Sequence, residues 1–325
     1  MRKPAVTRGT AFGLNIEADF SIPGLPPRGG ELPIATLVLA DDAELARAWH
    51  PAQERATRIS EEHVGREEPD RFIDADPETG YRLFARYFGS CLVSRDGARL
   101  LCVPPPVASW RWQRFLVGRC LPLAAMLRGY EVIHAGAVEI DGGVVAVVGP
   151  SGAGKSSLTV HLVLQGASFF TDDVLVLEES EGQLVAHPGF GVVNVRAAED
   201  ERLGDPHRVA LGAHLGKTGR YKHHYALTPA VGTRPLRALY LLSAGPGNAE
   251  SAIVRVPAPE PLRLLASAFI HDVRPPEQLA RLLDVCARLA ASVAIFDVAL
   301  GQDEDAAALA ARLRAHVQAG VGAHA

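Results

Sequence analysis

Apolar and polar residues alternate in several short stretches of the first 130 residues, which is the pattern of half-buried strands. The clearest stretch is 13–22, and a loop rich in Pro and Gly follows it. Between residues 109 and 129 the apolar positions recur at a helical spacing instead. We therefore predict that residues 1–130 form a β-containing module. Further strands are expected at 35–39, 81–87 and 99–103.

The next segment predicts two strands joined by a tight turn. Residues 133–140 have the pattern of one strand, 141–143 that of the turn, and 144–148 are uninterruptedly apolar, which is typical of a strand buried on both faces. Because the turn is too short for a parallel crossover, the two strands must be antiparallel. A helix as far as Leu164 and a short strand at 168–171 are expected next.

Clear patterns return after residue 235, whereas 200–230 is polar and has the weakest pattern of the chain. We predict an α/β fold in which residues 131–325 form a compact core around a mixed, twisted sheet. The elements expected near the end of the chain are strands at 236–242 and 292–298 and helices at 262–270, 279–289 and 305–317.

Composition excludes several classes of protein. Hydrophobic residues make up 48% of the chain and charged residues 22%, which suits a globular protein with a sizeable core. The net charge of −4 gives no support for a partner that is a nucleic acid. We see no apolar signal segment, no run of 18 apolar residues and no paired cysteines, so we expect a cytoplasmic protein that does not enter a membrane.

A phosphate-binding loop lies between the apolar run 144–148 and the helix that follows. Residues 149–156 match the pattern GxxxxGK[ST] at every position. The glycines let the backbone N–H groups point inward around an anion, and the N-terminus of the helix adds its positive dipole end. We therefore expect ATP and Mg²⁺ as cofactors, with Lys155 on the β- and γ-phosphates and the Ser156 hydroxyl on the metal. The predicted nucleotide-binding residues are Gly149, Ser151, Gly152, Ala153, Gly154, Lys155, Ser156 and Ser157.

Two adjacent acids, Asp172 and Asp173, end the short strand that begins 13 residues after Lys155. A strand in that position can lie beside the phosphate-loop strand, which brings its carboxyl end to the nucleotide. One carboxylate can then hold magnesium, and the other can accept a proton from a hydroxyl nucleophile. The alternative is an acid pair in a surface turn.

His134 and a basic stretch at 217–225 are further candidates for function. A lone histidine such as His134 is more often structural, and a basic stretch is as often a solvated loop. However, a transferring phosphoryl group needs cations around it, often from a mobile element. The chain uses only four lysines, two of which fall in this stretch, so Arg220 and Lys222 are predicted to contact phosphate.

These motifs together resemble the catalytic domain of HPr kinase/phosphorylase. The match consists of a histidine 15 positions before the first phosphate-loop glycine, then the loop, then the Asp-Asp pair, and it covers 131–195 well. The resemblance implies a P-loop fold related to that of phosphoenolpyruvate carboxykinase, an oligomer, and phosphorylation of a serine on a protein. It further implies that Asp172 is the general base, that Asp173 binds magnesium, and that His134 orients or charge-balances Asp172.

The chain departs from that family at two positions. Ser157 stands where the family has Glu, and 186–189 replaces its Glu-Ile-Arg-Gly segment. The reverse, phosphorolytic reaction is therefore not expected. Residues 12–14 and 22–26 are similar to shorter HPr-kinase-like proteins, some of which phosphorylate the C-terminal serine of lasso-peptide precursors.

We therefore expect a kinase that phosphorylates a serine of a peptide or small protein, with residues 1–130 packing on the core or presenting the substrate. Two other functions stay open. A nucleotide-sensing regulator would use the same loop without an acceptor hydroxyl, and a small-molecule kinase would need a closed acceptor pocket.

Overall fold

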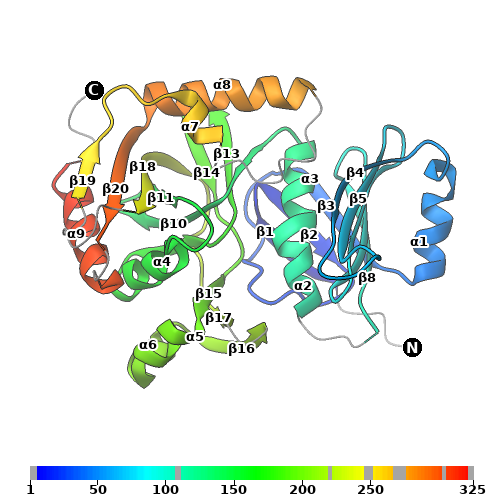
Figure 1. Ribbon diagram of the computed structural model, residues 1–325, viewed down its shortest axis with the longest axis horizontal. Helices are drawn as coiled ribbons and strands as arrows, with labels where there is room; N and C mark the ends of the chain where they lie inside the picture. Colours follow the sequence, from blue (N-terminus) through cyan, green and yellow to red (C-terminus); the bar gives the residue numbers. More distant parts are fainter. Residues whose placement is uncertain are drawn as a thin grey trace. The chain divides into compact units, whose positions relative to one another are not determined.

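The computed structural model describes residues 6–106, 111–218, 222–244, 252–265, 276–301 and 305–320. The chain divides into two compact units, which meet in the sequence between Tyr130 and Glu131 (Figure 1). The first comprises Met1–Tyr130 with Ile270–Pro275, and the second Glu131–Phe269 with Pro276–Ala325. Within the described residues, no helix combines the length and the apolarity that crossing a membrane requires.

The described strands of the first unit form one eight-stranded sheet in the order β1-β2-β3-β8-β7-β6-β5-β4. The pairs β2–β3 and β3–β8 are parallel, and the others are antiparallel. The predicted β-containing module is therefore confirmed. The strands are β1 Thr7–Ala11, β2 Leu14–Ala18, β3 Ile34–Leu39, β4 Thr57–Glu62, β5 Arg71–Asp76, β6 Gly80–Ala85, β7 Gly89–Ser94 and β8 Arg99–Val103.

Helices follow β3 and β8 in this unit. Asp41 and Glu44 form a reciprocal capping box at the start of α1, which buries Leu45 and Trp49. The expected helix at 109–129 is present from residue 111 but is interrupted by a π-helical turn, and residues 109 and 110 lie outside the described residues. The elements are α1 Asp42–Trp49, a 3₁₀ turn His50–Ala52, α2 Arg111–Phe115, the π-helical turn Leu116–Cys120 and α3 Leu121–Leu127.

Two strand predictions in this unit were too long. The alternation over 13–22 predicts a strand to residue 22, but β2 ends at Ala18, where its pairing with β3 ends. Likewise, β6 ends at Ala85, because a turn begins there with a hydrogen bond from Phe88 N to the Ala85 carbonyl (2.8 Å). Alternation of residue types therefore does not by itself fix where a strand ends.

All four cysteines are buried and form no disulfide, with side chains at most 1% exposed. Burial also raises the pKa of Cys91, Cys102 and Cys120, which disfavours the reactive thiolate. We expect no reaction of the native protein with a water-soluble disulfide reagent, and four thiols to react after unfolding in guanidinium. A thiol that reacts within seconds in the folded protein would contradict the burial described here.

The described strands of the second unit that pack in its core form a nine-stranded mixed sheet. Its path is β12-β10-β11-β18-β14-β13-β9, with β20 paired to β18 and β19 to β20. The pairs β11–β18 and β18–β20 are parallel, whereas β10–β11 is antiparallel as expected. The predicted α/β class with a mixed sheet is thus confirmed. The strands are β9 Glu131–Ile133, β10 Ala135–Ile140, β11 Gly143–Val148, β12 Ser168–Thr171, β13 Leu175–Ser180, β14 Gln183–His187, β18 Arg234–Ala244, β19 Ala252–Arg255 and β20 Ala294–Leu300.

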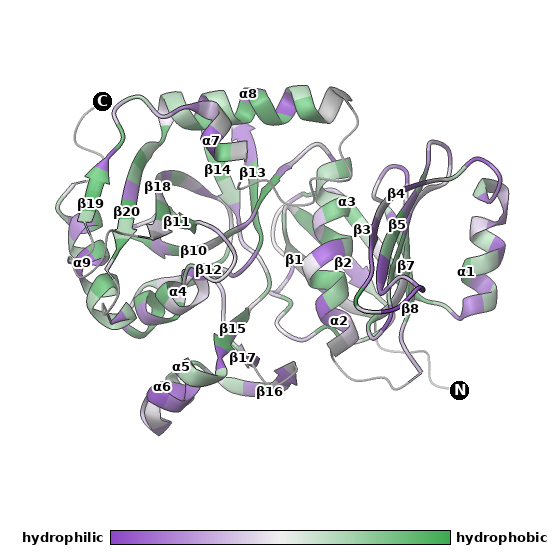
Figure 2. Cartoon of the chain, in the orientation of Figure 1, coloured by the Kyte–Doolittle hydropathy of each residue, from purple (hydrophilic) through white to green (hydrophobic). Residues whose placement is uncertain are grey.

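Helices cover both faces of this sheet, which explains the continuous apolar run of β11. Val145 and Val147 join the core under α4 and α9, while Val144, Ala146 and Val148 join the core under α8. Figure 2 shows the central strands as largely hydrophobic. The expected helix 262–270 is present to residue 265, and 266–270 lie outside the described residues. The helices are α4 Lys155–Leu164, α5 Ala197–Arg202, α6 Gly204–Ala210, α7 Pro261–Leu265, α8 Pro276–Ser292 and α9 Ala306–Gln318.

A small sheet within residues 192–226 completes the second unit, and two of its three strands lie in the polar region 200–230. Its order is β15-β17-β16, with all pairs antiparallel. The strands are β15 Val192–Arg196, β16 Ala213–Thr218 and β17 Lys222–Ala226.

Candidate functional site

The phosphate loop connects β11 to α4, as the motif requires. Gly149, Gly152 and Gly154 all have positive φ angles (156°, 91° and 93°), a region that glycine enters without strain. A β-carbon on Gly149 would also lie 2.8 Å from the Leu242 carbonyl oxygen. The curl of the loop therefore depends on glycine, and it ends at the N-terminus of α4, where backbone N–H groups favour an anion.

The remaining predicted loop residues lie around this curl. Ser151 is exposed, Ala153 is half-buried beside the core, and Ser157 is half-buried in the first turn of α4. Lys155 is only 6% exposed, and its Nζ donates to the carbonyl oxygens of Gly149 (2.8 Å) and Pro150 (3.2 Å). Burial lowers the pKa of Lys155, and the charges of the two aspartates oppose this shift. The ammonium group therefore lies inside the loop, where a phosphate would be held.

The strand β12 pairs with β10 and not, as predicted, with the phosphate-loop strand β11. Asp172, which follows β12, nevertheless contacts the loop directly, and Asp173 lies next to it. The Ser156 hydroxyl donates to Oδ1 of Asp172 (2.9 Å), and the backbone N–H and side-chain amide of Asn194 donate to its Oδ2 (2.9 and 2.7 Å). The same Asn194 amide nitrogen lies 2.8 Å from Oδ2 of Asp173. Asp173 itself has a left-handed backbone (φ 68°), a conformation often found at functional sites.

Burial and the neighbouring Asp173 raise the pKa of Asp172 to about 7, although its donors from Asn194 and Ser156 act in the opposite direction. A carboxylate with such a pKa is suited to accept a proton at neutral pH. A pair of acids in a solvated surface turn would not show this set of contacts.

The donor set beside the loop fits magnesium. The Ser156 hydroxyl and the two aspartate carboxylates offer hard oxygen ligands, which Mg²⁺ prefers. The described residues contain no cluster of three or more His, Cys, Asp or Glu able to hold a metal.

His134 lies between β9 and β10 and interrupts the single strand predicted at 133–140. Its Nδ1 lies 2.7 Å from the backbone carbonyl oxygen of Asp173. Burial lowers the pKa of His134, and Lys155 lowers it further, so the neutral imidazole donates through Nδ1–H to that carbonyl. The structure thus brings His134 to the backbone of the acid pair.

Asn194 and His224 are site residues that the sequence reasoning missed. They lie opposite each other on β15 and β17, and Nδ1 of His224 is 2.8 Å from Oδ1 of Asn194. Both side chains are buried, at 6% and 0% exposure. A signal was present in the sequence, because Asn194 is a polar residue within a run of valines, and a polar side chain in a buried strand needs a specific partner.

Arg196, also missed, and Lys222 lie on the same face of this sheet as Asn194. They are opposite each other on β15 and β17, two pairs along from Asn194 and His224, which returns to the same face. A β-carbon on Gly152 would lie 3.2 Å from Nη2 of Arg196, so the guanidinium lies over the phosphate loop. Lys222 is near enough that its charge adds to burial in lowering the pKa of Lys155. Arg220 lies outside the described residues.

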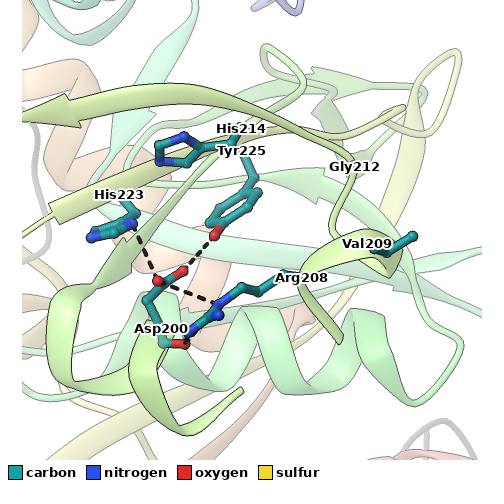
Figure 3. Close-up of a pocket in the computed structure, with 7 residues that line it drawn as sticks. All are labelled: Asp200, Arg208, Val209, Gly212, His214, His223 and Tyr225. Atoms are coloured by element: carbon teal, nitrogen blue, oxygen red, sulfur yellow. Dashed lines mark hydrogen bonds and ion pairs between the residues drawn. The ribbon is translucent and has the colours of Figure 1, made fainter. Parts of the chain in front are cut away.

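Two other residues of the basic stretch, His223 and Tyr225, face away from Asp172 and Asp173. Because side chains alternate along a strand, His223 and Tyr225 point to the opposite face of β17 from His224. There the Tyr225 hydroxyl donates to Asp200 (2.5 Å), and His223 and Arg208 also contact that carboxylate, at the edge of a cavity of about 420 Å³ (Figure 3). The basic stretch therefore contributes Lys222 and His224 to the face that carries Asn194, and His223 and Tyr225 to the cavity on the opposite face.

Comparisons with known proteins add little to this geometry. No protein-family model matches the chain, and no curated protein matches it by sequence. Among solved structures, it is similar to the Hpr(Ser) kinase/phosphatase from Coxiella burnetii at 13% identity, over 59% of this chain and 99% of that one. The TM-score is 0.32, and a similarity at that level carries no conclusion about function.

Proposed function

We propose that this protein is a kinase that uses ATP and Mg²⁺ to phosphorylate a serine hydroxyl of a peptide or small protein. The observation that carries the proposal is the contact between the Asp172 carboxylate and the Ser156 hydroxyl of the phosphate loop (2.9 Å). It puts a carboxylate with a raised pKa within reach of the position of a bound γ-phosphate.

The side chains divide the reaction between them. Lys155 and the N-terminus of α4 hold the phosphates, and Ser156 and Asp173 hold magnesium, which neutralises charge on the phosphates. Asp172 takes the proton of the acceptor hydroxyl as the oxygen forms its bond to the γ-phosphorus, and ADP leaves. Lys222 and Arg196 neutralise charge on the transferring group from the small sheet.

The class of acceptor rests on sequence resemblance. Residues 12–14 and 22–26 are similar to the short kinases that act on lasso-peptide precursors. A precursor peptide with a serine at its C-terminus is therefore the first acceptor to test, with the first unit as the element that presents it.

We expect the purified full-length chain, incubated with Mg-ATP and peptides encoded near its gene, to add one phosphate to a serine of one peptide. Intact-mass spectrometry measures the gain. Lys155→Ala should weaken ATP binding by about tenfold to hundredfold, because a hydrogen bond to a charged group contributes roughly 1.5–3 kcal/mol. Lys217→Ala, which removes an exposed lysine, is the matched control and should leave binding unchanged.

The other outcomes separate the alternatives. ATP binding without phosphate on any peptide, but with rapid turnover of a small hydroxylated compound, would identify a small-molecule kinase. Slow hydrolysis with a large difference in partner affinity between ATP and ADP would identify a nucleotide-sensing regulator. A wild-type chain that does not bind ATP would refute the proposal at its first step.

A further inference from the structure

Asn194 contacts both members of the acid pair through one side-chain amide. Its Nδ2 lies 2.7 Å from Oδ2 of Asp172 and 2.8 Å from Oδ2 of Asp173, and its backbone N–H reaches Asp172 as well. The two protons of an amide –NH₂ group suffice for two acceptors. The amide therefore spans the two carboxylates and sets the separation between one oxygen of each.

His224 determines which way this amide points. Its Nδ1 lies 2.8 Å from Oδ1 of Asn194, and the ring is completely buried. In the reverse orientation the amide oxygen would face two carboxylates, with no proton between them. The arrangement is satisfied only when His224 carries its proton on Nδ1 and Asn194 turns its –NH₂ group toward the acids. The register of β15 with β17 brings the two residues together.

The acid pair needs such a support for three reasons. Adjacent carboxylates repel each other, and Asp173 has a left-handed backbone that the surrounding structure must hold in place. In addition, the proposed reaction gives the two acids different tasks, which requires that their oxygens keep fixed positions. Partners that hydrogen-bond a metal-binding carboxylate orient it, and their loss typically lowers metal affinity by about 10–100-fold.

We infer that Asn194, oriented by His224, is the positioning residue that holds Asp173 in the geometry that binds magnesium with the nucleotide and keeps Asp172 in place beside it as the base. The inference rests on the proposed function for the identity of the metal and the nucleotide. It also assigns a function to the small sheet, whose strands β15 and β17 place Asn194 and His224 beside the two acids. This part of the chain has no recognisable sequence motif.

The test compares ATP affinity, by calorimetry on the full chain, in Mg²⁺ and in EDTA. The ratio of the two affinities is the magnesium-dependent gain. Asn194→Ala should reduce this gain by about 10–100-fold while the affinity in EDTA changes little. Val193→Ala is the matched control, because Val193 is a buried residue of the same strand on the opposite face. It should lower the melting temperature and leave the gain unchanged.

A pair of His224 variants tests the orientation separately. His224→Asn keeps an N–H donor near the position of Nδ1, whereas His224→Leu keeps only bulk. We expect the Leu variant to lose most of the magnesium-dependent gain and the Asn variant to retain more of it. Equal gains in these two variants would show that His224 acts by packing alone, and would overturn its assigned task.

Failure of the inference can be told apart from failure of the proposed function. If Asn194→Ala keeps the magnesium-dependent gain in ATP affinity of the wild type, the inference is wrong and the proposed function is not affected. A wild-type gain that Asn194→Ala removes, with no acceptor peptide phosphorylated, supports the inference and refutes the peptide kinase. A wild-type chain whose ATP affinity is the same in Mg²⁺ and in EDTA refutes both.

Discussion

Replacing Asp172 with Asn should lower the rate of phosphoryl transfer by about 10²–10⁴-fold, the usual contribution of a positioned general base. The amide that replaces the carboxylate has no affinity for a proton at neutral pH, so the acceptor hydroxyl would have to lose its proton to water. ATP affinity should stay within a few-fold of the wild type, because Lys155 and the glycine loop are unchanged. Single-turnover transfer to the acceptor peptide, measured at saturating ATP, gives the rate.

The contacts of Asp172 allow this variant to fold. Both Asn194 donors reach Oδ2, which the amide oxygen of the new side chain can replace. Its –NH₂ group would then face the Ser156 hydroxyl, which can accept a hydrogen bond as well as donate one. Asp205→Asn is the matched control, since the Asp205 side chain is 92% exposed on α6. Transfer at a near wild-type rate in Asp172→Asn would show that another group is the base.

The elements that the sequence predicted well are those whose pattern is local. The phosphate loop depends on glycines at set spacings, and β11 on an unbroken apolar run, and each is visible within ten residues. The antiparallel pairing of β10 with β11 follows from the length of one turn. A local pattern needs no knowledge of the rest of the chain.

The parts that the sequence did not predict depend on contacts between distant segments. Asn194 reaches Asp172 across 22 positions, and His224 reaches Asn194 across 30. The small sheet that brings them together has short strands in a polar region, so its pattern was the weakest of the chain. His134 breaks the strand predicted at 133–140, because β9 pairs with β13 while β10 pairs with β11 and β12. No residue within that stretch signals the change of partner.

The largest effect on stability is expected at Tyr240. This residue of β18 is fully buried, its ring stacks on Phe296 (centroids 5.1 Å apart), and its hydroxyl is 2.9 Å from Nδ1 of His316 on α9. Tyr240→Ala removes an aromatic ring from the centre of the sheet and leaves a cavity. For large aromatic side chains in protein cores this typically costs about 3–5 kcal/mol, a large part of the roughly 5–15 kcal/mol that stabilises most domains.

Tyr240→Phe is the control that separates the ring from the hydroxyl. It loses only the contact with His316, which is half-buried and can turn to water, so its cost should be about 1 kcal/mol. Urea unfolding followed by far-ultraviolet circular dichroism measures both variants. The tryptophans Trp49, Trp110 and Trp112 all precede the second unit, so their fluorescence separately follows the first. If Tyr240→Ala unfolds at the same urea concentration as Tyr240→Phe, then the ring does not hold the sheet to α9. In that case the neighbouring side chains must move to fill the cavity.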